Sequence, residues 1–280
     1  MQVLEPVRLP LAAPVPRARR AWGPALLQIY TWLVIAFVLV PIVVMVVYSF
    51  NQTPNGRVTL FWHGFTTDWY AHAFGIADLT SALVHSLEIA FGSTAIALLL
   101  GTPMALAMGR WRFRGKAVSD LLVFIDIAAP SVVVGASLLS FFIALNVPQG
   151  LLTILIAHVA FELAFVVAVI RARVSGLDRM LDRAAADLGA TPWQAFRYVT
   201  LPLTLPGIVG AGALAFGLSI DDVIITNFVA GPKLTFPLWV YGAVKIGIPP
   251  QVFVLSTLIF LGGLLLAAVN WWFARRRPAS

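Results

Sequence analysis

The chain has 280 residues, of which 60% are hydrophobic and only 11% are charged, and it carries a formal net charge of +7. Soluble domains contain about 25% charged residues, so this composition excludes an ordinary soluble protein and indicates a chain that crosses a membrane several times. It contains no cysteine, which excludes disulfide bonds and cysteine-ligated metals, and we predict no catalytic residue, metal or cofactor.

The chain begins with a stretch rich in proline and arginine, residues 1–24, which we interpret as a basic cytoplasmic tail rather than a cleaved signal peptide because it has no apolar core. The apolar runs that follow are each long enough to cross about 30 Å of hydrocarbon as a helix. We predict a membrane domain over residues 25–273 and a second cytoplasmic tail over 274–280. Its six predicted spans are 25–50, 81–108, 120–145, 151–170, 207–229 and 252–273.

The basic residues are distributed unevenly between the two sides of these spans. If both termini are cytoplasmic, 16 of the 19 Lys and Arg residues lie inside, and only Arg57, Lys233 and Lys245 lie outside. Cytoplasmic segments are enriched in Lys and Arg, so this distribution predicts that both termini are cytoplasmic. It also explains the net charge without a nucleic-acid partner.

The polar segment 177–206 interrupts the apolar pattern between the fourth and fifth spans. Its apolar residues recur at helical spacing before Gly189, a typical residue just beyond a helix end, and Thr191-Pro192 is typical of a new helix start. We predict two short amphipathic helices joined at a glycine bend, with Pro202 and Pro206 separating them from the next span. The residues alone leave two interpretations open, an interfacial linker and a docking element for another protein.

Two motifs resemble a known family. The pattern Ala184-Ala185-x-x-x-Gly189, with Phe196, Leu201-Pro202 and Pro206 after it, resembles the "EAA" cytoplasmic loop of permease subunits of binding-protein-dependent ABC importers. The segment GLSIDDVIITNFVAGP, residues 217–232, is similar to the spermidine/putrescine branch of that family. One position departs from the motif, because the usual first Glu is Arg183 here, with Asp182 beside it.

The resemblance implies an all-α, six-span membrane protein of the type I ABC importer permease class, located in a bacterial inner membrane, with a cytoplasmic coupling helix. It implies a dimer of cytoplasmic ATPases, a second related permease and an extracytoplasmic solute-binding protein as partners. The chain has no G-x-x-x-x-G-K-[ST] motif, so we expect another subunit to hydrolyse ATP. The residues expected at the ATPase contact are Arg183, Ala184, Ala185, Asp187, Leu188, Gly189, Ala190, Trp193, Phe196 and Pro202.

Placing an ionisable side chain within a membrane span costs free energy, so each such residue is expected to have a structural or functional role. Asp221 and Asp222 lie in the predicted fifth span, and successive residues point about 100° apart around a helix. With Ser219 and Thr226 they favour either a path for a cation or packing against a partner permease, and Asp126 is a weaker candidate for the same path.

Two further pairs of polar residues share a helix face. These are His85 with Glu88, and His158 with Glu162, and we interpret them as groups that hold the bundle together rather than as metal ligands. Trp239 and Tyr241 in the loop 230–250 favour a membrane interface, with stacking on a cation as the alternative.

The resemblance favours a polyamine as the solute, with opines, phosphonates, thiamine or ferric iron as alternatives. The competing hypothesis from another class is a proton-coupled secondary transporter that uses Glu88, Asp126, Glu162 and Asp222 as a relay. A Walker-type ATPase encoded beside the chain or purified with it distinguishes the two.

Overall fold

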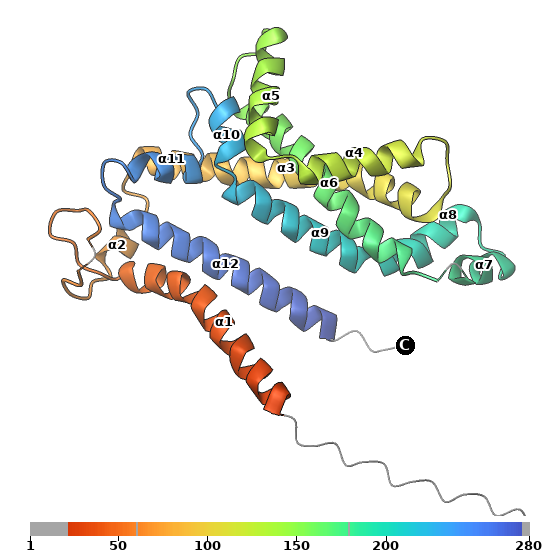
Figure 1. The fold of residues 1–280 in the computed structure, drawn as a ribbon, viewed down its shortest axis with the longest axis horizontal. Helices are drawn as coiled ribbons and strands as arrows, with labels where there is room; N and C mark the ends of the chain where they lie inside the picture. The colour runs from red at the N-terminus through yellow and green to blue at the C-terminus, as the bar shows by residue number, and fades with distance from the viewer. Residues whose placement is uncertain (1–21, 60, 179, 276–280) are drawn as a thin grey trace, which may run out of the picture.

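The structure is a computed structural model that describes residues 22–59, 61–178 and 180–275, and throughout these residues it consists of helices and connecting loops (Figure 1). The longer helices are α1 (Trp22–Tyr48), α3 (Ala77–Arg110), α6 (Leu151–Ser175), α9 (Leu201–Asp221) and α12 (Pro250–Arg275). The shorter ones are α2 (Asp68–Ala71), α4 (Lys116–Ala128), α5 (Ser131–Ala144), α7 (Met180–Asp187), α8 (Pro192–Ala195), α10 (Ile224–Val229) and α11 (Phe236–Ala243). Most of the two predicted tails, residues 1–21 and 276–280, lies outside the described residues.

Within the described residues, four helical segments are long and apolar enough to cross a membrane: Leu26–Tyr48, Ala77–Arg110, Leu151–Ser175 and Pro192–Asp221. The bent pair α4 and α5 gives a fifth crossing if it is one span, and α12 contains a further apolar stretch, Pro250–Leu265. The predicted all-α polytopic class is therefore confirmed, and the helix count agrees approximately with six predicted spans.

The third predicted span is not one straight helix. The structure breaks it at Ala129 and Pro130, and the axes of α4 and α5 differ by 107°. Proline disfavours helical geometry in the residue before it, and Ala129 is accordingly extended, with φ −69° and ψ 131°. The prediction of a continuous helix over 120–145 was wrong because the apolar pattern continues across this proline.

The boundaries of the fifth span also differ from the prediction. Helix continues from α8 through a π-helical turn, Phe196–Thr200, into α9, so Pro202 and Pro206 do not separate the polar segment from the span. Pro202 follows the π-helical turn, in which the Leu201 N–H donates five residues back to the Phe196 carbonyl, and such a local adjustment accommodates a proline in a membrane helix. At its other end α9 stops at Asp221 and α10 follows as a separate helix, whereas we predicted one helix through Val229.

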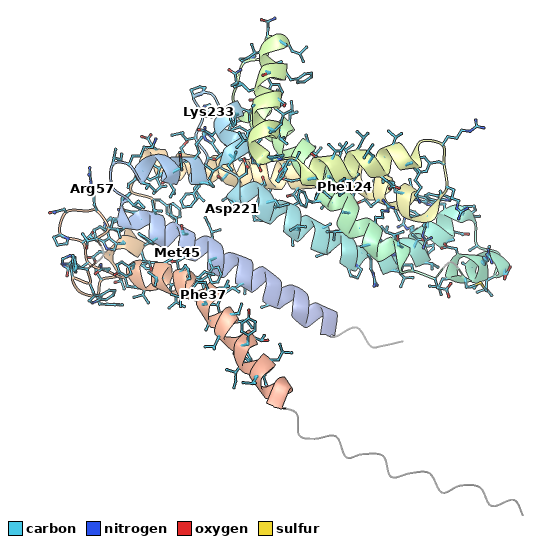
Figure 2. The ribbon with its side chains drawn as sticks, viewed as in Figure 1. Phe37, Met45, Arg57, Phe124, Asp221 and Lys233 are labelled. Atoms are coloured by element: carbon cyan, nitrogen blue, oxygen red, sulfur yellow. The ribbon has the colours of Figure 1, made fainter. Side chains whose placement is uncertain are left out.

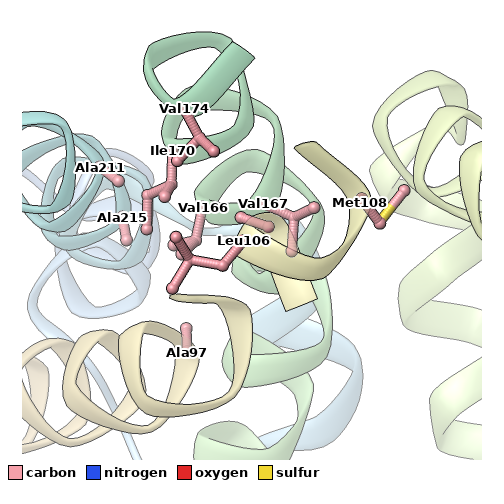
Figure 3. Packing of buried hydrophobic residues seen from close by; sticks show 10 residues of the cluster. Ala97, Leu106, Met108, Val166, Val167, Ile170, Val174, Ala211 and Ala215 are labelled. Atoms are coloured by element: carbon pink, nitrogen blue, oxygen red, sulfur yellow. The ribbon is translucent and has the colours of Figure 1, made fainter. Parts of the chain in front are cut away.

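Helices α3, α6 and α9 form the centre of the molecule (Figure 1). Figure 3 shows the cluster of buried side chains between them, which includes Ala97, Val166, Ile170 and Ala211. Gly101 of α3 faces Val166 so closely that an added Cβ would lie 2.7 Å from its Cγ1. Small residues on α3 therefore let α6 approach closely, as is common between membrane helices.

The polar segments lie at opposite ends of the molecule. Figure 1 shows α7 and α8 at one end, and α2, α11 and the loop after α1 at the other. At the second end the two predicted outer loops meet, since the Val58 N–H donates to the Ile248 carbonyl at 2.8 Å. This separation places the predicted ATPase contact and the predicted outer surface at opposite ends of the helix bundle.

Candidate functional site

The bend between α7 and α8 is a regular helix ending. The Gly189 N–H donates to the Ala186 carbonyl at 2.9 Å, and the Ala190 N–H donates to the Ala185 carbonyl at 3.0 Å. This pair of bonds defines a Schellman motif, which requires a left-handed residue after the helix, and Gly189 has φ +84°. The glycine bend and the first short helix predicted from the sequence are confirmed, whereas the second helix starts where predicted but continues into α9.

Helix α8 begins with a capping box. The Thr191 Oγ1 accepts a hydrogen bond from the Gln194 N–H at 3.4 Å, and the Gln194 side-chain oxygen accepts one from the Thr191 N–H at 2.8 Å. Because two N–H groups at the helix start are satisfied reciprocally, the turn between α7 and α8 has one defined geometry.

Asp182 attaches this loop to the membrane domain. Its carboxylate forms an ion pair with Arg110, the last residue of α3, and accepts a hydrogen bond from the Thr200 hydroxyl at 3.1 Å. The Arg110 guanidinium also donates to the Thr200 Oγ1 at 2.9 Å. Asp182 thus joins α3, α7 and the π-helical turn, whereas the neighbouring Arg183 is exposed.

Large apolar side chains on this loop are exposed. Leu188 is 89% exposed and Trp193 is 65% exposed, although the Trp193 ring also packs on Phe196 at 5.4 Å between centroids. Phe196 is half-buried against the central cluster. Among the other residues expected to contact the ATPase, Ala185 and Ala190 are half-buried, and the exposed ones are Arg183, Ala184, Asp187, Gly189 and Pro202.

A second group of polar residues lies at the break between α9 and α10. The Asp222 carboxylate accepts hydrogen bonds from the Thr226 N–H at 2.7 Å, from the Thr226 hydroxyl at 2.8 Å and from the Ile225 N–H at 3.3 Å. Free N–H groups at a helix start need such acceptors, so Asp222 caps the first turn of α10 and stabilises the break.

His158 of α6 joins this break to the rest of the bundle. Its Nδ1 lies 2.7 Å from the Ser219 Oγ, and its Nε2 lies 2.9 Å from the Thr226 Oγ1 and 3.5 Å from the Asp222 carboxylate. His158 is only 2% exposed. Three of the predicted path residues, Ser219, Asp222 and Thr226, are therefore brought together around a histidine that we had interpreted as a packing residue.

The same network continues to Glu162 through Ser93 of α3. The Ser93 Oγ lies 2.9 Å from the Glu162 Oε1 and 3.2 Å from the Ser219 Oγ. Glu162 is fully buried, and its Oε2 has no hydrogen-bond partner within the described structure. The sequence signal for His158 and Glu162 was their i, i+4 spacing on one helix face, but nothing in the sequence indicated Ser93.

Asp221 points away from this network. It is exposed and lines a cavity of about 600 Å³ between α1, α9, α11 and α12. The walls are mainly apolar, and the other polar groups are the Tyr241 hydroxyl and Ser256. Figure 2 labels Asp221 and Met45, which line this cavity from α9 and α1. The arrangement offers one carboxylate at the edge of an apolar space.

The remaining candidates lie apart from these two groups. Asp126 is near the end of α4, and its carboxylate forms no hydrogen bond or ion pair with any described residue. The His85 ring donates to the Leu234 carbonyl at 3.1 Å, and Glu88 is exposed. Trp239 is partly buried among α2, α3 and α12, whereas the Lys245 Nζ lies 5.6 Å from the Tyr241 ring.

Residues 97–277, well over half of the chain, match the family described as "Binding-protein-dependent transport system inner membrane component". The chain belongs to this family of inner-membrane transport permeases. The match includes α6, the polar loop and the α9–α10 break, so both groups of residues above lie within the matched residues, except for Ser93.

Two groups of relatives are similar over most of this permease. It is 36% identical over 241 residues to the spermidine/putrescine transport system permease protein PotC of Escherichia coli K12, which covers 86% of this chain and 90% of the relative. It is 37% identical over 248 residues to the putrescine transport system permease protein PotI of the same organism, covering 86% and 87%. PotC of Haemophilus influenzae is 35% identical over 88% of this chain and 95% of the relative.

Solved structures of bacterial importers have the same fold. An alginate ABC transporter, in complex with an alginate pentasaccharide-bound periplasmic protein, aligns with a TM-score of 0.65 and 14% identity over 94% of this permease and 99% of that chain. An inward-facing MetNI methionine ABC transporter aligns with a TM-score of 0.57 and 19% identity over 71% and 94%. These similarities support the type I importer fold.

Proposed function

We propose that this chain is a permease subunit of an ATP-driven importer and forms part of the membrane path for a polyamine such as putrescine or spermidine. The observation that carries the proposal is the 35–37% identity to polyamine permeases over at least 86% of the chain. These relatives favour a polyamine over opines, phosphonates, thiamine or ferric iron.

The cavity beside Asp221 suits this class of solute. A polyamine is a chain of methylene groups with ammonium groups along it. A site that binds it therefore needs an apolar wall for the methylene groups and carboxylates or aromatic faces for the ammonium groups. Asp221 lies on the cavity wall and Tyr241 supplies an aromatic ring there, and cations bind well to the faces of such rings. In this proposal Asp221 contacts an ammonium group, and Asp222, Ser219 and Thr226 shape the wall. Asp126, which forms no polar contact here, has the weakest support.

The polar loop provides the connection to an energy source. The chain has no phosphate-binding loop motif, and we propose that it is not itself an enzyme. A dimer of cytoplasmic ATPases binds α7 and α8 through the exposed residues around Gly189 and Trp193. Residues 177–206 act as the coupling loop, and the ion pair of Asp182 with Arg110 transmits its movement to α3.

The outer end of the molecule provides the surface for delivery. One structural relative is described in complex with a periplasmic solute-bound protein, and the family description itself names binding-protein-dependent transport. We propose that a solute-binding protein docks at the loops around α2 and α11. In this proposal a second, related permease completes the path. Residues 1–24 and 274–280 are cytoplasmic tails in this arrangement.

The proposal is tested with the chain coexpressed with the permease, ATPase and binding protein encoded beside it. The complex is placed in liposomes, and ATP hydrolysis and uptake are measured with the binding protein empty or loaded with putrescine or spermidine. Stimulated hydrolysis with ATP-dependent uptake supports the proposal. If ATP hydrolysis is not stimulated by putrescine or spermidine, the assignment of a polyamine as the solute is wrong. Uptake that persists after ATP depletion but is abolished by an uncoupler supports the proton-coupled alternative.

A further inference from the structure

Six side chains form one continuous series of hydrogen bonds across four elements of the bundle, and we name this series the polar chain. In order of contact they are Glu162, Ser93, Ser219, His158, Thr226 and Asp222. The first five are at most 5% exposed. Because buried polar groups are satisfied by partners rather than by water, the hydrogen atoms available to these links can be counted.

The polar chain has five links and therefore needs five hydrogen atoms. Its three hydroxyl groups supply one each, and the imidazole Nε2–H supplies a fourth to the Thr226 Oγ1, because the Thr226 hydroxyl hydrogen is used on Asp222. The fifth link is complete only if one more proton is present, on His158, Glu162 or Asp222. Asp222 stays ionised, because both of its carboxylate oxygens accept backbone N–H groups. The second contact of Ser93, with the Ala90 carbonyl, is 3.4 Å long and competes weakly with the 2.9 Å contact to Glu162.

With Asp222 ionised, the extra proton has two positions that satisfy every link. In the first, His158 is an imidazolium whose Nδ1–H donates to Ser219, Ser219 donates to Ser93, and Ser93 donates to the Glu162 carboxylate. In the second, the protonated Glu162 donates to Ser93, Ser93 donates to Ser219, and Ser219 donates to the neutral Nδ1. The two arrangements differ by three proton hops along contacts of 2.7, 3.2 and 2.9 Å.

We propose that the polar chain is a proton relay that holds one proton and moves it between His158 and Glu162. From His158 to Glu162 each hop breaks one N–H or O–H bond and forms one O–H bond, and the return reverses these hops, so no proton enters or leaves. The net charge of the three ionisable groups is −1 in both arrangements, but its location changes. With the proton on His158 the Asp222 carboxylate is neutralised, and with the proton on Glu162 it is not.

The surroundings of the polar chain leave few other groups to control this proton. The titratable members come from α6 (His158 and Glu162) and from the residue after α9 (Asp222), while α3 and α10 contribute only hydroxyls. Helix α5, which packs on α10, has no ionisable residue. Among the described residues no group of three His, Asp or Glu side chains could hold a metal ion. Glu162 is therefore a positioning residue that sets the charge at the α9–α10 break.

This location links the relay to a cationic solute, and here the inference rests on the proposed function. A cation that reaches the α9–α10 break disfavours an imidazolium nearby, since like charges in a poorly solvated site repel strongly. The proton then moves to Glu162, and the Asp222 charge becomes available to the cation without proton exchange with water.

Infrared spectroscopy of the assembled importer tests the relay, because a protonated carboxyl group has a C=O band apart from carboxylate bands. In His158→Gln the proton has lost its first position, so the band of protonated Glu162 should be present at rest, shift in D₂O and disappear in the additional variant Glu162→Gln. Asp222→Asn removes the counter-charge of the imidazolium and should give the same band. Absence of the band from both His158→Gln and Asp222→Asn overturns the relay.

The unsubstituted importer links the relay to the solute. Addition of putrescine-loaded binding protein should produce the Glu162 band, Ser93→Ala should abolish it, and Ser93→Thr should restore it. Glu88→Gln, a substitution of an exposed carboxylate on α3, should leave it unchanged. A solute-induced band that persists in Ser93→Ala overturns the relay. If the band appears at rest in His158→Gln but not with putrescine, the relay stands and the polyamine proposal fails.

Discussion

Asp182 and Arg110 form an ion pair between the first turn of α7 and the last residue of α3, with the Thr200 hydroxyl contacting both. The side chain of Arg110 is 12% exposed and that of Asp182 is 33% exposed, so the pair is screened less than a surface ion pair. The carboxylate that attaches the loop lies one position before Arg183. Asp182 was not among the ten residues that we expected at the ATPase contact.

Asp182→Ala should loosen the loop. Removing one partner of a mostly buried charged contact costs about 1–3 kcal/mol, so amide hydrogen exchange in α7 should accelerate and coupled uptake should fall while complex assembly persists. Asp187→Ala, an exposed substitution on the same helix, is the control for the exchange measurement and should leave amide exchange in α7 unchanged. Equal acceleration of exchange in the two variants would show that the ion pair has no special role.

Gly189→Ala should destabilise the bend between α7 and α8 through backbone strain alone. An added Cβ meets no atom within 4 Å, but φ is +84°, a conformation that costs an L-residue about 1–2 kcal/mol. Gly189→Asn should cost less, because Asn tolerates this region better.

The measurement is the ATP hydrolysed per polyamine imported by each variant, which should rise in Gly189→Ala. Gly210→Ala in α9 is the matched control, since it also meets no atom within 4 Å and its φ is not positive. If Gly189→Ala hydrolyses the normal amount of ATP per polyamine imported, the geometry of the bend is not needed for coupling.

Gly101→Ala should weaken the packing of α3 on α6. The added Cβ would lie 2.7 Å from the Val166 Cγ1, and overpacking of this kind costs about 1–3 kcal/mol. The thermal midpoint of the purified complex should fall, and Val166→Ala in the same chain should recover part of the loss. Gly262→Ala, which meets no atom within 4 Å, should have little effect on the midpoint.

Asp221→Asn and Asp222→Asn should have different effects although the residues are adjacent. Asp221 is exposed on the cavity wall and forms no hydrogen bond with any described residue, so its substitution should raise the KM for putrescine about tenfold, equivalent to ~1.4 kcal/mol, without loss of stability. Asp222 caps α10, so its substitution should also lower the thermal midpoint. Uptake kinetics combined with thermal unfolding distinguish these results, and an unchanged KM in Asp221→Asn would place the solute elsewhere.

The absence of cysteine makes the topology testable with single-cysteine variants. Leu188→Cys and Ser280→Cys should react with a membrane-impermeant maleimide only after the membrane is opened, whereas Lys233→Cys should react in intact cells. Labelling of Ser280→Cys in intact cells would contradict a cytoplasmic carboxyl terminus.

Local patterns in the sequence predicted several elements correctly. The bend at Gly189 and the start at Thr191 follow from short-range backbone geometry, which neighbouring residues determine. Pro130 itself is a local signal for the break between α4 and α5. The prediction followed the apolar pattern instead, which continues across this proline. Continuation of helix through Pro202 depended on the π-helical turn before it, which no propensity rule indicates.

The sequence by itself determined that the chain is an all-helical membrane protein, because hydropathy and the distribution of basic residues depend only on composition along the chain. It also determined the first short helix of the polar loop, the bend at Gly189 and the start of the next helix. The tertiary structure decided which polar groups meet. Ser93, Glu162 and Ser219 are at least 57 residues apart, and only the close packing of α3, α6 and α9 joins them. Tertiary packing likewise turned Asp222 inward to His158 and left Asp221 on a cavity wall, because the helix ends between them.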